Sequence, residues 1–262
     1  MSSTKNNLLS YEEVDKIAIL TLNRPNQQNA LSSELMTALL NKLHEIKNNK
    51  DIKVVALFAN GKNFCAGHDL KELKVDKSEK RFKQIFELCS SLMLEILKLP
   101  KPVIAGVQGI ATAAGCQLVA TCDLAIASES SKFATPGVNI GLFCSTPMVA
   151  VSRNIHRKQT MEMLLMGDFI SPSKAKDIGL INNVVKDNDL KDETIKIAKM
   201  IATKSTTTVA IGKEAFYKQL EMGIEDAYKY TSKVMSSNML NKDAQEGISA
   251  FIENRDPIWS DK

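Results

Sequence analysis

Several residue patterns that mark common functional sites are missing from this chain of 262 residues. It has only three histidines and five cysteines, with no CxxC pair, whereas most zinc sites need such ligands at short spacing. The glycine-rich nucleotide-binding sequences GxxxxGKS/T and GxGxxG are absent as well. We therefore expect neither a metal site nor a resident cofactor.

The chain also lacks a strong charge imbalance and a long hydrophobic run. Its 34 basic and 30 acidic residues are interspersed, so no nucleic-acid partner is expected. No apolar segment reaches the ~18–20 residues of a membrane helix, so no membrane partner is expected. The N-terminus has no apolar signal-peptide core and carries early acidic residues, unlike a transit peptide. Together with unpaired cysteines, this predicts a cytoplasmic protein.

Strand-like and helix-like segments alternate in the first half of the chain. Short runs rich in Ile, Leu and Val predict strands at residues 14–22, 54–58, 103–107 and 124–127. Apolar residues at helical spacing predict helices at residues 32–48 and 85–99, and another from residue 116. This alternation predicts the α/β class, with parallel strands joined by right-handed crossovers.

The pattern becomes mostly helical from about Met148 onward. Amphipathic helices are expected over residues 190–204, 208–220 and 224–239, with the polar residues 206–208 forming a turn. We predict one α/β domain over residues 1–200 and a helical extension over residues 201–262. Such a short extension is expected to pack on the domain or on a neighbouring subunit.

Two loops rich in small residues follow predicted strands and precede predicted helices. They are NGKNFCAGHDL at residues 60–70 and GIATAAGCQ at residues 109–117. Small residues at a helix N-terminus leave backbone N–H groups uncovered, and such groups bind anions or developing oxyanions. Each loop alone is explained more simply as a tight turn, but together they could give two N–H groups to one carbonyl oxygen.

Six segments in order resemble the crotonase superfamily, the enoyl-CoA hydratase/isomerase family. They are LNRP with NAL at residues 22–31, FCAGHDL at 64–70, KPVIA at 101–105, GCQL with CDLAIA at 115–127, FATP with IG at 133–141, and AKDIGLINNVV at 175–185. The resemblance extends over about residues 10–255. It implies a ββα spiral core, a C-terminal helical trimerisation region, and homotrimers or homohexamers.

The resemblance also implies where an acyl-CoA thioester would bind. Its carbonyl oxygen would lie between the backbone N–H groups of His68 and Ala114, and the helix starting near Ala114 would point its positive end at that oxygen. Coenzyme A would enter as part of the thioester substrate. The residues that would line its groove are Arg24, Ala30, Ala66, Gly67, His68, Asp69, Leu70, Ile110 and Pro136.

Two positions depart from the pattern of this family's hydratases, which carry two glutamates that hold the water and move the proton. By position, Gln117 and Gly137 stand in their place. An amide does not accept a proton at neutral pH and glycine has no side chain, so efficient hydration is not expected. A hydratase/isomerase activity of fatty acid metabolism is the first expectation. Decarboxylation, thioester hydrolysis, isomerisation and non-catalytic acyl-CoA binding by an oligomer are the alternatives.

Several polar residues near the two loops have more than one open role. Gln117 and Asn139 either position a water or a polar acyl group, or form structural hydrogen bonds. Cys144 and Ser145 are candidate nucleophiles without an evident base. The Arg24 side chain either contacts CoA phosphates or is solvated in a turn.

Three further features of this region also have two interpretations. Asp69 is expected to cap the helix that follows it. The His68 side chain either reaches CoA or the pocket, or points to solvent. The charged segment of residues 71–83 is either a solvated helix or a lid over the acyl chain.

Overall fold

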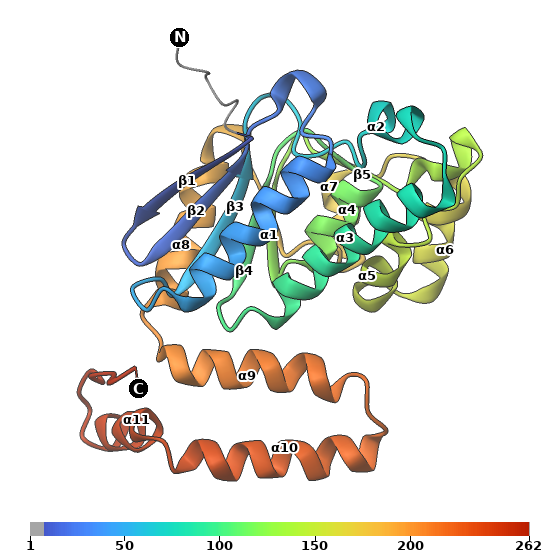
Figure 1. The fold of residues 1–262 in the computed structure, drawn as a ribbon. Helices are drawn as coiled ribbons and strands as arrows, with labels where there is room; N and C mark the ends of the chain where they lie inside the picture. The colour runs from blue at the N-terminus through green and yellow to red at the C-terminus, as the bar shows by residue number, and fades with distance from the viewer. Residues whose placement is uncertain (1–7, 262) are drawn as a thin grey trace.

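The computed structural model describes residues 8–261, and its strands form two sheets (Figure 1). The main sheet has the order β1-β2-β3-β4-β6-β8, and β5 pairs with β7 in the second sheet. The strands are β1 (Leu9–Val14), β2 (Ile17–Leu22), β3 (Val54–Ala59), β4 (Val103–Val107), β5 (Ile110–Thr112), β6 (Leu124–Ser128), β7 (Lys132–Ala134) and β8 (Asn183–Val185). All of these pairs are parallel except β1–β2, so the predicted parallel α/β sheet is confirmed.

One predicted strand was wrong in its extent. Residues 14–22 form the end of β1 and all of β2, which are joined by a two-residue turn at Asp15 and Lys16. Both turn residues have positive φ, 51° and 65°. Tight hairpin turns of this kind usually carry Asn-Gly or Asp-Gly, so Asp-Lys gave no turn signal.

Helices connect the strands and form the C-terminal part of the described chain. They are α1 (Ser33–Asn48), α2 (Leu70–Val75), α3 (Glu79–Lys98), α4 (Ala114–Thr121), α5 (Pro147–Asn154), α6 (Arg157–Met166), α7 (Pro172–Asp177), α8 (Leu190–Ala202), α9 (Thr206–Gln219), α10 (Ile224–Met239) and α11 (Lys242–Ile252). Helix α3 starts six residues before the predicted position, because Ser78 caps it by accepting a hydrogen bond from the N–H of Arg81.

Both faces of the main sheet are buried, each by different helices (Figure 1). Leu20 and Leu57 belong to the core that includes the apolar residues of α1 and α3. Ile19 and Phe58, their neighbours in sequence, pack in a second cluster with Leu190 of α8. Successive strand residues point to opposite faces, so a strand covered on both sides is apolar throughout. That is why β3 was evident from the sequence.

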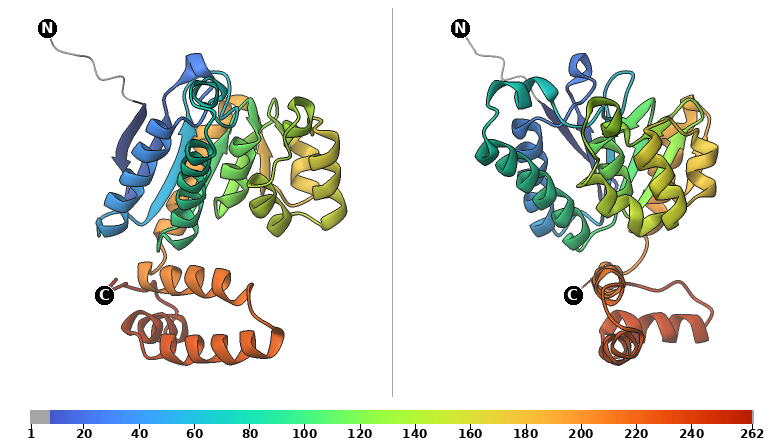
Figure 2. Two further views of the ribbon diagram at one scale, coloured as in Figure 1. Left: turned by 45° about the vertical axis from the view of Figure 1, so that its right-hand side comes forward. Right: turned by 90° about the vertical axis from the view of Figure 1, so that its right-hand side faces the viewer.

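The last three helices form a layer of their own beside the sheet-containing body, as Figures 1 and 2 show in three views. The prediction of a turn at residues 206–208 was wrong, because these threonines form the first turn of α9 and Ser205 caps it. Many apolar side chains of this helical part are exposed, including Phe216, Ile224, Tyr228, Phe251 and Ile252. The domain boundary at residue 200 stays a prediction.

A buried ion pair fastens α9 to the main body. Lys213 Nζ lies 2.6 Å from Asp123 Oδ2, and it also donates to the carbonyls of Ile96 at 2.9 Å and Lys101 at 3.0 Å. Burial lowers the pKa of Lys213, and the nearby Asp123 carboxylate opposes that shift. Tyr217 donates to the other oxygen of Asp123 at 2.8 Å. Asp123 therefore has a structural role.

We expect Lys213→Ala to lower the free energy of unfolding by about 3–5 kcal/mol, because it leaves Asp123 without its charged partner. Urea unfolding followed by circular dichroism measures this change. The control is Lys229→Ala on α10, since Lys229 is exposed and its ion-pair distance to Asp226 is 3.8 Å. Equal effects of the two substitutions would contradict the proposed role of the buried pair.

Candidate active site

Three loops meet at the carboxyl edge of the main sheet, after β2, β3 and β4. The N–H of Leu31 donates to the Gly67 carbonyl at 2.7 Å, which joins the first loop to the second. Two hydrogen bonds join the second loop to β5. The Cys65 N–H donates to the Ile110 carbonyl at 3.0 Å, and the Thr112 N–H donates to the Cys65 carbonyl at 3.0 Å. In open parallel sheets, ligands bind at this edge. Both loops singled out from the sequence therefore lie at one place.

Two asparagines that the sequence did not single out hold these loops together. The Asn29 side chain is fully buried, donates to the carbonyls of Asn60 at 2.9 Å and Asn63 at 2.8 Å, and accepts from the Arg24 N–H at 2.8 Å. Asn63 in turn accepts from the Ile110 N–H at 3.1 Å. Asn29 has a φ of 53°, which asparagine tolerates well, and Asn in a turn is the signal that could have identified it.

Arg24 and Asp69 connect the first loop to the second through their side chains. Arg24 Nη2 lies 2.8 Å from Asp69 Oδ2, and Nη1 donates to the Ala30 carbonyl. Asp69 also caps α2, as predicted, by accepting from the N–H groups of Lys71 at 3.0 Å and Glu72 at 3.4 Å. Burial alone would raise the pKa of Asp69, but the Arg24 hydrogen bond and these N–H groups lower it on balance. Arg24 is thus no solvated turn residue.

The second loop packs directly against the start of α4. A β-carbon added to Gly115 would lie 2.2 Å from the Cys65 carbonyl oxygen, so only glycine fits there. Gly67 has a φ of 96°, and a β-carbon on it would lie 3.5 Å from the Ala114 nitrogen. The small residues in these loops therefore permit direct contact between two backbone segments.

Each of the two segments in contact carries an unpaired backbone N–H group. Among residues 8–261, the N–H groups of His68 and Ala114 have no hydrogen-bond acceptor. Ala113, just before α4, has φ 48° and ψ −117°, a conformation that costs about 1–3 kcal/mol for a residue other than glycine. Its N–H donates to the Ala134 carbonyl at 3.0 Å. Backbone strain is thus present where α4 presents its first N–H.

The His68 ring lies edge-on to Phe86 of α3, with 5.2 Å between ring centroids. Both ring nitrogens are buried, and neither has a hydrogen-bond partner within the described part of the chain. Burial lowers the pKa of His68, while the nearby Leu31 carbonyl and Glu72 carboxylate oppose that shift. The imidazole is therefore neutral at pH 7 and does not point to solvent.

Gln117 is buried one helical turn after Ala114, with 4% of its surface exposed. Its Oε1 lies 3.9 Å from the Sγ of Cys89 on α3. Gly137 lies in the 3-10 helix of residues Pro136–Ile140, and its N–H donates to Cys144 Sγ at 3.3 Å. A β-carbon on Gly137 would lie 2.7 Å from the Leu142 carbonyl oxygen and 2.9 Å from that sulfur. The space beside Gly137 is therefore occupied.

The other predicted site residues divide into those at the loop contact and those away from it. Ala30 and Gly67 are buried there, Ala66, Ile110 and Pro136 are partly exposed, and Leu70 is exposed. Asn139 and Ser145 are exposed, and the Ser145 hydroxyl donates only to the Phe143 carbonyl, at 3.3 Å. Among residues 8–261, neither of these two lies beside a base, and their roles stay predictions.

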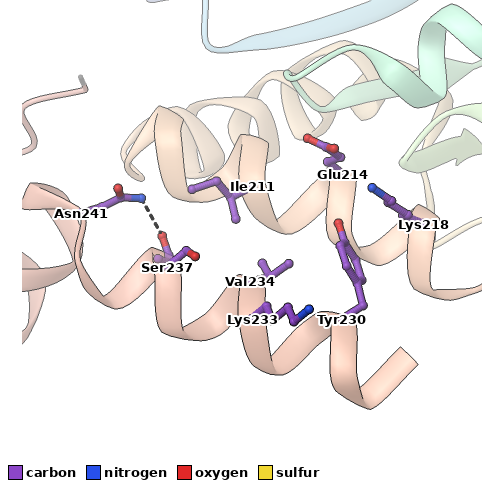
Figure 3. Close-up of a pocket in the computed structure, with 9 residues that line it drawn as sticks. Ile211, Glu214, Lys218, Tyr230, Lys233, Val234, Ser237 and Asn241 are labelled. Carbon is purple, nitrogen blue, oxygen red and sulfur yellow. Dashed lines mark hydrogen bonds between the residues drawn. The ribbon is translucent and has the colours of Figure 1, made fainter. Parts of the chain in front are cut away.

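A groove of about 420 Å³ lies elsewhere, between α9 and α10 (Figure 3). Lys218 Nζ lies 4.9 Å from the centre of the Tyr230 ring on one side of it, and Asn241 donates to Asn238 at 3.2 Å at the other end. None of the residues predicted for catalysis or CoA binding lines this groove. The loop contact therefore remains the candidate site.

Comparison with known proteins agrees with the fold. A sequence model of the enoyl-CoA hydratase/isomerase family matches residues 12–262. The chain belongs to this family. It is 46% identical to the rat enoyl-CoA hydratase domain-containing protein 3, over 97% of this chain and 84% of that protein.

Solved structures of the family confirm the crotonase fold. One is an enoyl-CoA hydratase of Mycobacterium smegmatis, with a TM-score of 0.94 and 47% identity over 96% of this chain and 98% of that one. Another is the human enoyl-CoA hydratase domain-containing protein 3, with a TM-score of 0.93 and 44% identity over 96% of this chain and all of that one.

The prediction of a cytoplasmic location was wrong. The rat, human and mouse relatives named enoyl-CoA hydratase domain-containing protein 3 are all described as mitochondrial. The expectation rested partly on residues 1–7, which lie outside the described residues. Within the described range, no helix is long and apolar enough to cross a membrane. No group of three or more His, Cys, Asp or Glu residues in the same range is placed to hold a metal ion.

The loop contact makes Gly115 a sensitive position of this crotonase fold. We expect Gly115→Ala to push α4 away from Cys65 and to lower the free energy of unfolding by about 1–3 kcal/mol, as overpacking does in a dense core. Chemical unfolding measures the change. Gly212→Ala on α9 is the control, because a β-carbon there meets nothing within 4 Å. A Gly115→Ala protein as stable as the wild type would contradict the close contact.

The buried imidazole of His68 makes stability depend on pH. The folded-state pKa lies below the unfolded value of 6.5, so the unfolded chain takes up the proton first as the pH falls. The free energy of unfolding should therefore decrease from pH 7 to pH 5, by at most about 1.4 kcal/mol per pH unit.

The substitution His68→Phe keeps an aromatic ring beside Phe86 and should remove this part of the pH dependence. Urea unfolding at pH 7 and pH 5 measures it, with His44→Phe at an exposed position as the control. If the wild type and His68→Phe lose equal stability, the imidazole does not remain neutral in the folded state.

Proposed function

We propose that this protein binds an acyl-CoA thioester at the loop contact, with the thioester oxygen between the N–H groups of His68 and Ala114. The observation that carries this proposal is the pair of unpaired N–H groups on two backbone segments in contact. The positive end of α4 adds to their effect, because Ala114 is the first residue of that helix. An oxyanion or enolate formed at this oxygen is stabilised most, and each such donor typically contributes about 10²–10³-fold in rate.

The side chains near this oxygen do not supply the acid and base of a hydratase. By the resemblance, glutamates would stand where Gln117 and Gly137 are. Gln117 cannot act as a base, and a side chain at Gly137 would meet Leu142 and Cys144. We therefore propose that enoyl-CoA hydration is slow here. The nine residues that the resemblance assigns to the CoA site, from Arg24 to Pro136, are proposed to line it. Arg24 contributes by holding Asp69 and Ala30 in place.

A second candidate reaction, decarboxylation, is favoured by the absence of a base at Gln117. The bond between the α-carbon and the carboxylate breaks, its electron pair forms the thioester enolate, and carbon dioxide leaves. Water then protonates the α-carbon. This step needs the two N–H donors but no proton acceptor.

We also propose that copies of this chain assemble through the C-terminal helices into trimers or hexamers. The supporting observation is the set of exposed apolar side chains on α9, α10 and α11, such as Phe216, Tyr228 and Phe251. Monomeric proteins rarely expose large contiguous apolar patches.

Calorimetric titration with butyryl-CoA tests the acyl-CoA site. We expect measurable binding by the wild type and at least about tenfold weaker binding by Gly115→Ala, which moves the Ala114 N–H. Crotonyl-CoA should lose its enoyl absorbance no faster than in a blank. The proposal fails if no CoA ester binds, and rapid hydration would refute the part that concerns the missing base.

A further inference from the structure

The helical layer of α9–α11 is joined to the sheet-containing body by one short connection. Helix α8 packs on one face of the main sheet, where Leu190 and Ala198 belong to the second core cluster. Residues 203–205 lead from α8 into α9, and α10 and α11 follow in the same layer (Figures 1 and 2). Neither core cluster of the described chain extends beyond Ala202. The layer is therefore attached to the body by means other than a shared apolar core.

The segment that follows α11 folds back onto this connection. Trp259 Nε1 donates to the Thr203 carbonyl at 2.7 Å, and the Thr206 N–H donates to Asp261 Oδ1 at 2.8 Å. These two bonds lie on either side of residues 204–205. We refer to residues 255–261 as the strap, because they span the connection between α8 and α9.

A buried carboxylate of α11 holds the end of the strap and the connection together. Asp243, with 3% of its surface exposed, accepts from the Ser205 hydroxyl at 2.6 Å. It also accepts from the Ser260 N–H at 2.7 Å, the Ser260 hydroxyl at 2.8 Å and the Asp261 N–H at 3.2 Å. Hydrogen bonds to a carboxylate are stronger than those between neutral groups. The strap and the connection are thus bonded to the same strong acceptor.

The start of the strap is bonded to α11 as well. Arg255 and Glu246 form two bonds of 2.6 and 3.0 Å, and the Ile258 N–H donates to the same carboxylate at 2.8 Å. The Trp259 ring lies against α11, because a β-carbon on Gly247 would lie 3.3 Å from it. The strap is therefore fixed to the layer along its length, and its far end reaches the connection.

Lys53, directly before β3, joins the strap to the body. Its Nζ lies 2.7 Å from Asp261 Oδ2 and donates to the Lys204 carbonyl at 3.3 Å. The Lys53 side chain is only 9% exposed, so its charge depends on these partners. One cation of the body thus holds both the strap and the connection.

We propose that the strap keeps the connection closed and so fixes the orientation of the helical layer on the body. When the strap detaches, residues 203–205 open and the layer pivots about the Lys213–Asp123 pair, while both core clusters stay intact. Segments that bury few apolar side chains open locally in this way, at a lower free energy than global unfolding. The inference does not depend on acyl-CoA binding.

Limited digestion with trypsin tests this role, because the protease cuts after lysine and the bond between Lys204 and Ser205 lies inside the connection. In the closed state Ser205 is 4% exposed and the Lys204 carbonyl is hydrogen-bonded, so cleavage requires opening. Cleavage that requires opening follows the population of the open form. Mass spectrometry of the fragments 1–204 and 205–262 measures the rate.

Two substitutions should speed this cleavage. Lys53→Met keeps the apolar stem but removes the cation, and we expect cleavage at least about tenfold faster, as for the loss of a charged hydrogen bond. Trp259→Phe keeps a ring beside Gly247 but removes one neutral donor, and we expect an increase of about two- to tenfold.

Lys50→Met is the matched control, since Lys50 is exposed three residues before Lys53. It should leave the cleavage after Lys204 at the wild-type rate. Cleavage after Lys77, in the exposed link between α2 and α3, is followed in the same digests and should change in none of the variants.

Equal cleavage after Lys204 in the wild type and both substituted proteins, including no cleavage in any of them, would overturn the proposed role. An equal increase after Lys77 would also overturn it, because it reports unfolding of the body. If Lys53→Met does not fold, Trp259→Phe decides. Amide hydrogen exchange of Thr206, whose N–H is bonded to the strap, is the second measurement and should be faster in the variants that are cut faster.

Discussion

The closeness of two backbone segments, at Gly115 and Cys65, is the constraint on which the candidate site depends. The Cys65 carbonyl occupies the place where a Gly115 side chain would begin. The same carbonyl accepts the Thr112 N–H at 3.0 Å, so the second loop is bound to β5 and in contact with α4 at once. Asn29 and the Arg24–Asp69 pair fix the first loop to that assembly. The N–H groups of His68 and Ala114 lie on these joined segments. Donors fixed in place before a ligand binds are the ones that best stabilise a developing charge.

We propose that the protein differs from a hydratase in the surroundings of this donor pair. Replacing a carboxylate by an amide at residue 117 changes the nearest side chain from a proton acceptor to a hydrogen-bond donor. At residue 137 the change is steric as well as chemical, since Cys144 and Leu142 lie where a side chain would extend. The two positions are therefore not equivalent: a glutamate at 117 has nearly the same size as the glutamine present, whereas one at 137 requires the loop of residues 141–145 to move.

Much of the fold followed from the sequence because its signals are local. The runs at β3 and β4 are apolar throughout, and Ser32 caps α1 through the Leu35 N–H. The hairpin at Asp15 and Lys16 was missed because Asp-Lys is not a residue pair typical of turns with two positive φ angles. Asn29 was missed for a different reason. Two of its side-chain hydrogen bonds reach Asn60 and Asn63, more than thirty residues away, and the third comes from the Arg24 N–H in the same turn. A local sequence pattern does not identify the distant partners.

The backbone geometry of the candidate site was predictable from the sequence, whereas its side-chain surroundings were not. Small residues at 67 and 115 indicated free N–H groups, and the structure leaves those of His68 and Ala114 without an acceptor among residues 8–261. The neutral state of His68 depends on its burial against Phe86. This contact joins the second loop to α3, and no local sequence pattern indicates it.

Helix α4 connects this site to the C-terminal helices. Its first residue presents an N–H group to the loop contact, and Asp123, two residues after its last, binds Lys213 and Tyr217 of α9. Asp123 also accepts from the Val103 N–H at 2.7 Å, so α4 is anchored to the sheet at the same point. Packing of α9 on the main body therefore contacts the chain just after the C-terminal end of α4, and the N-terminal end of α4 belongs to the candidate site. Any assembly that covers the exposed faces of α9–α11 also stabilises that anchor, because it restricts the motion of the helix that carries Lys213.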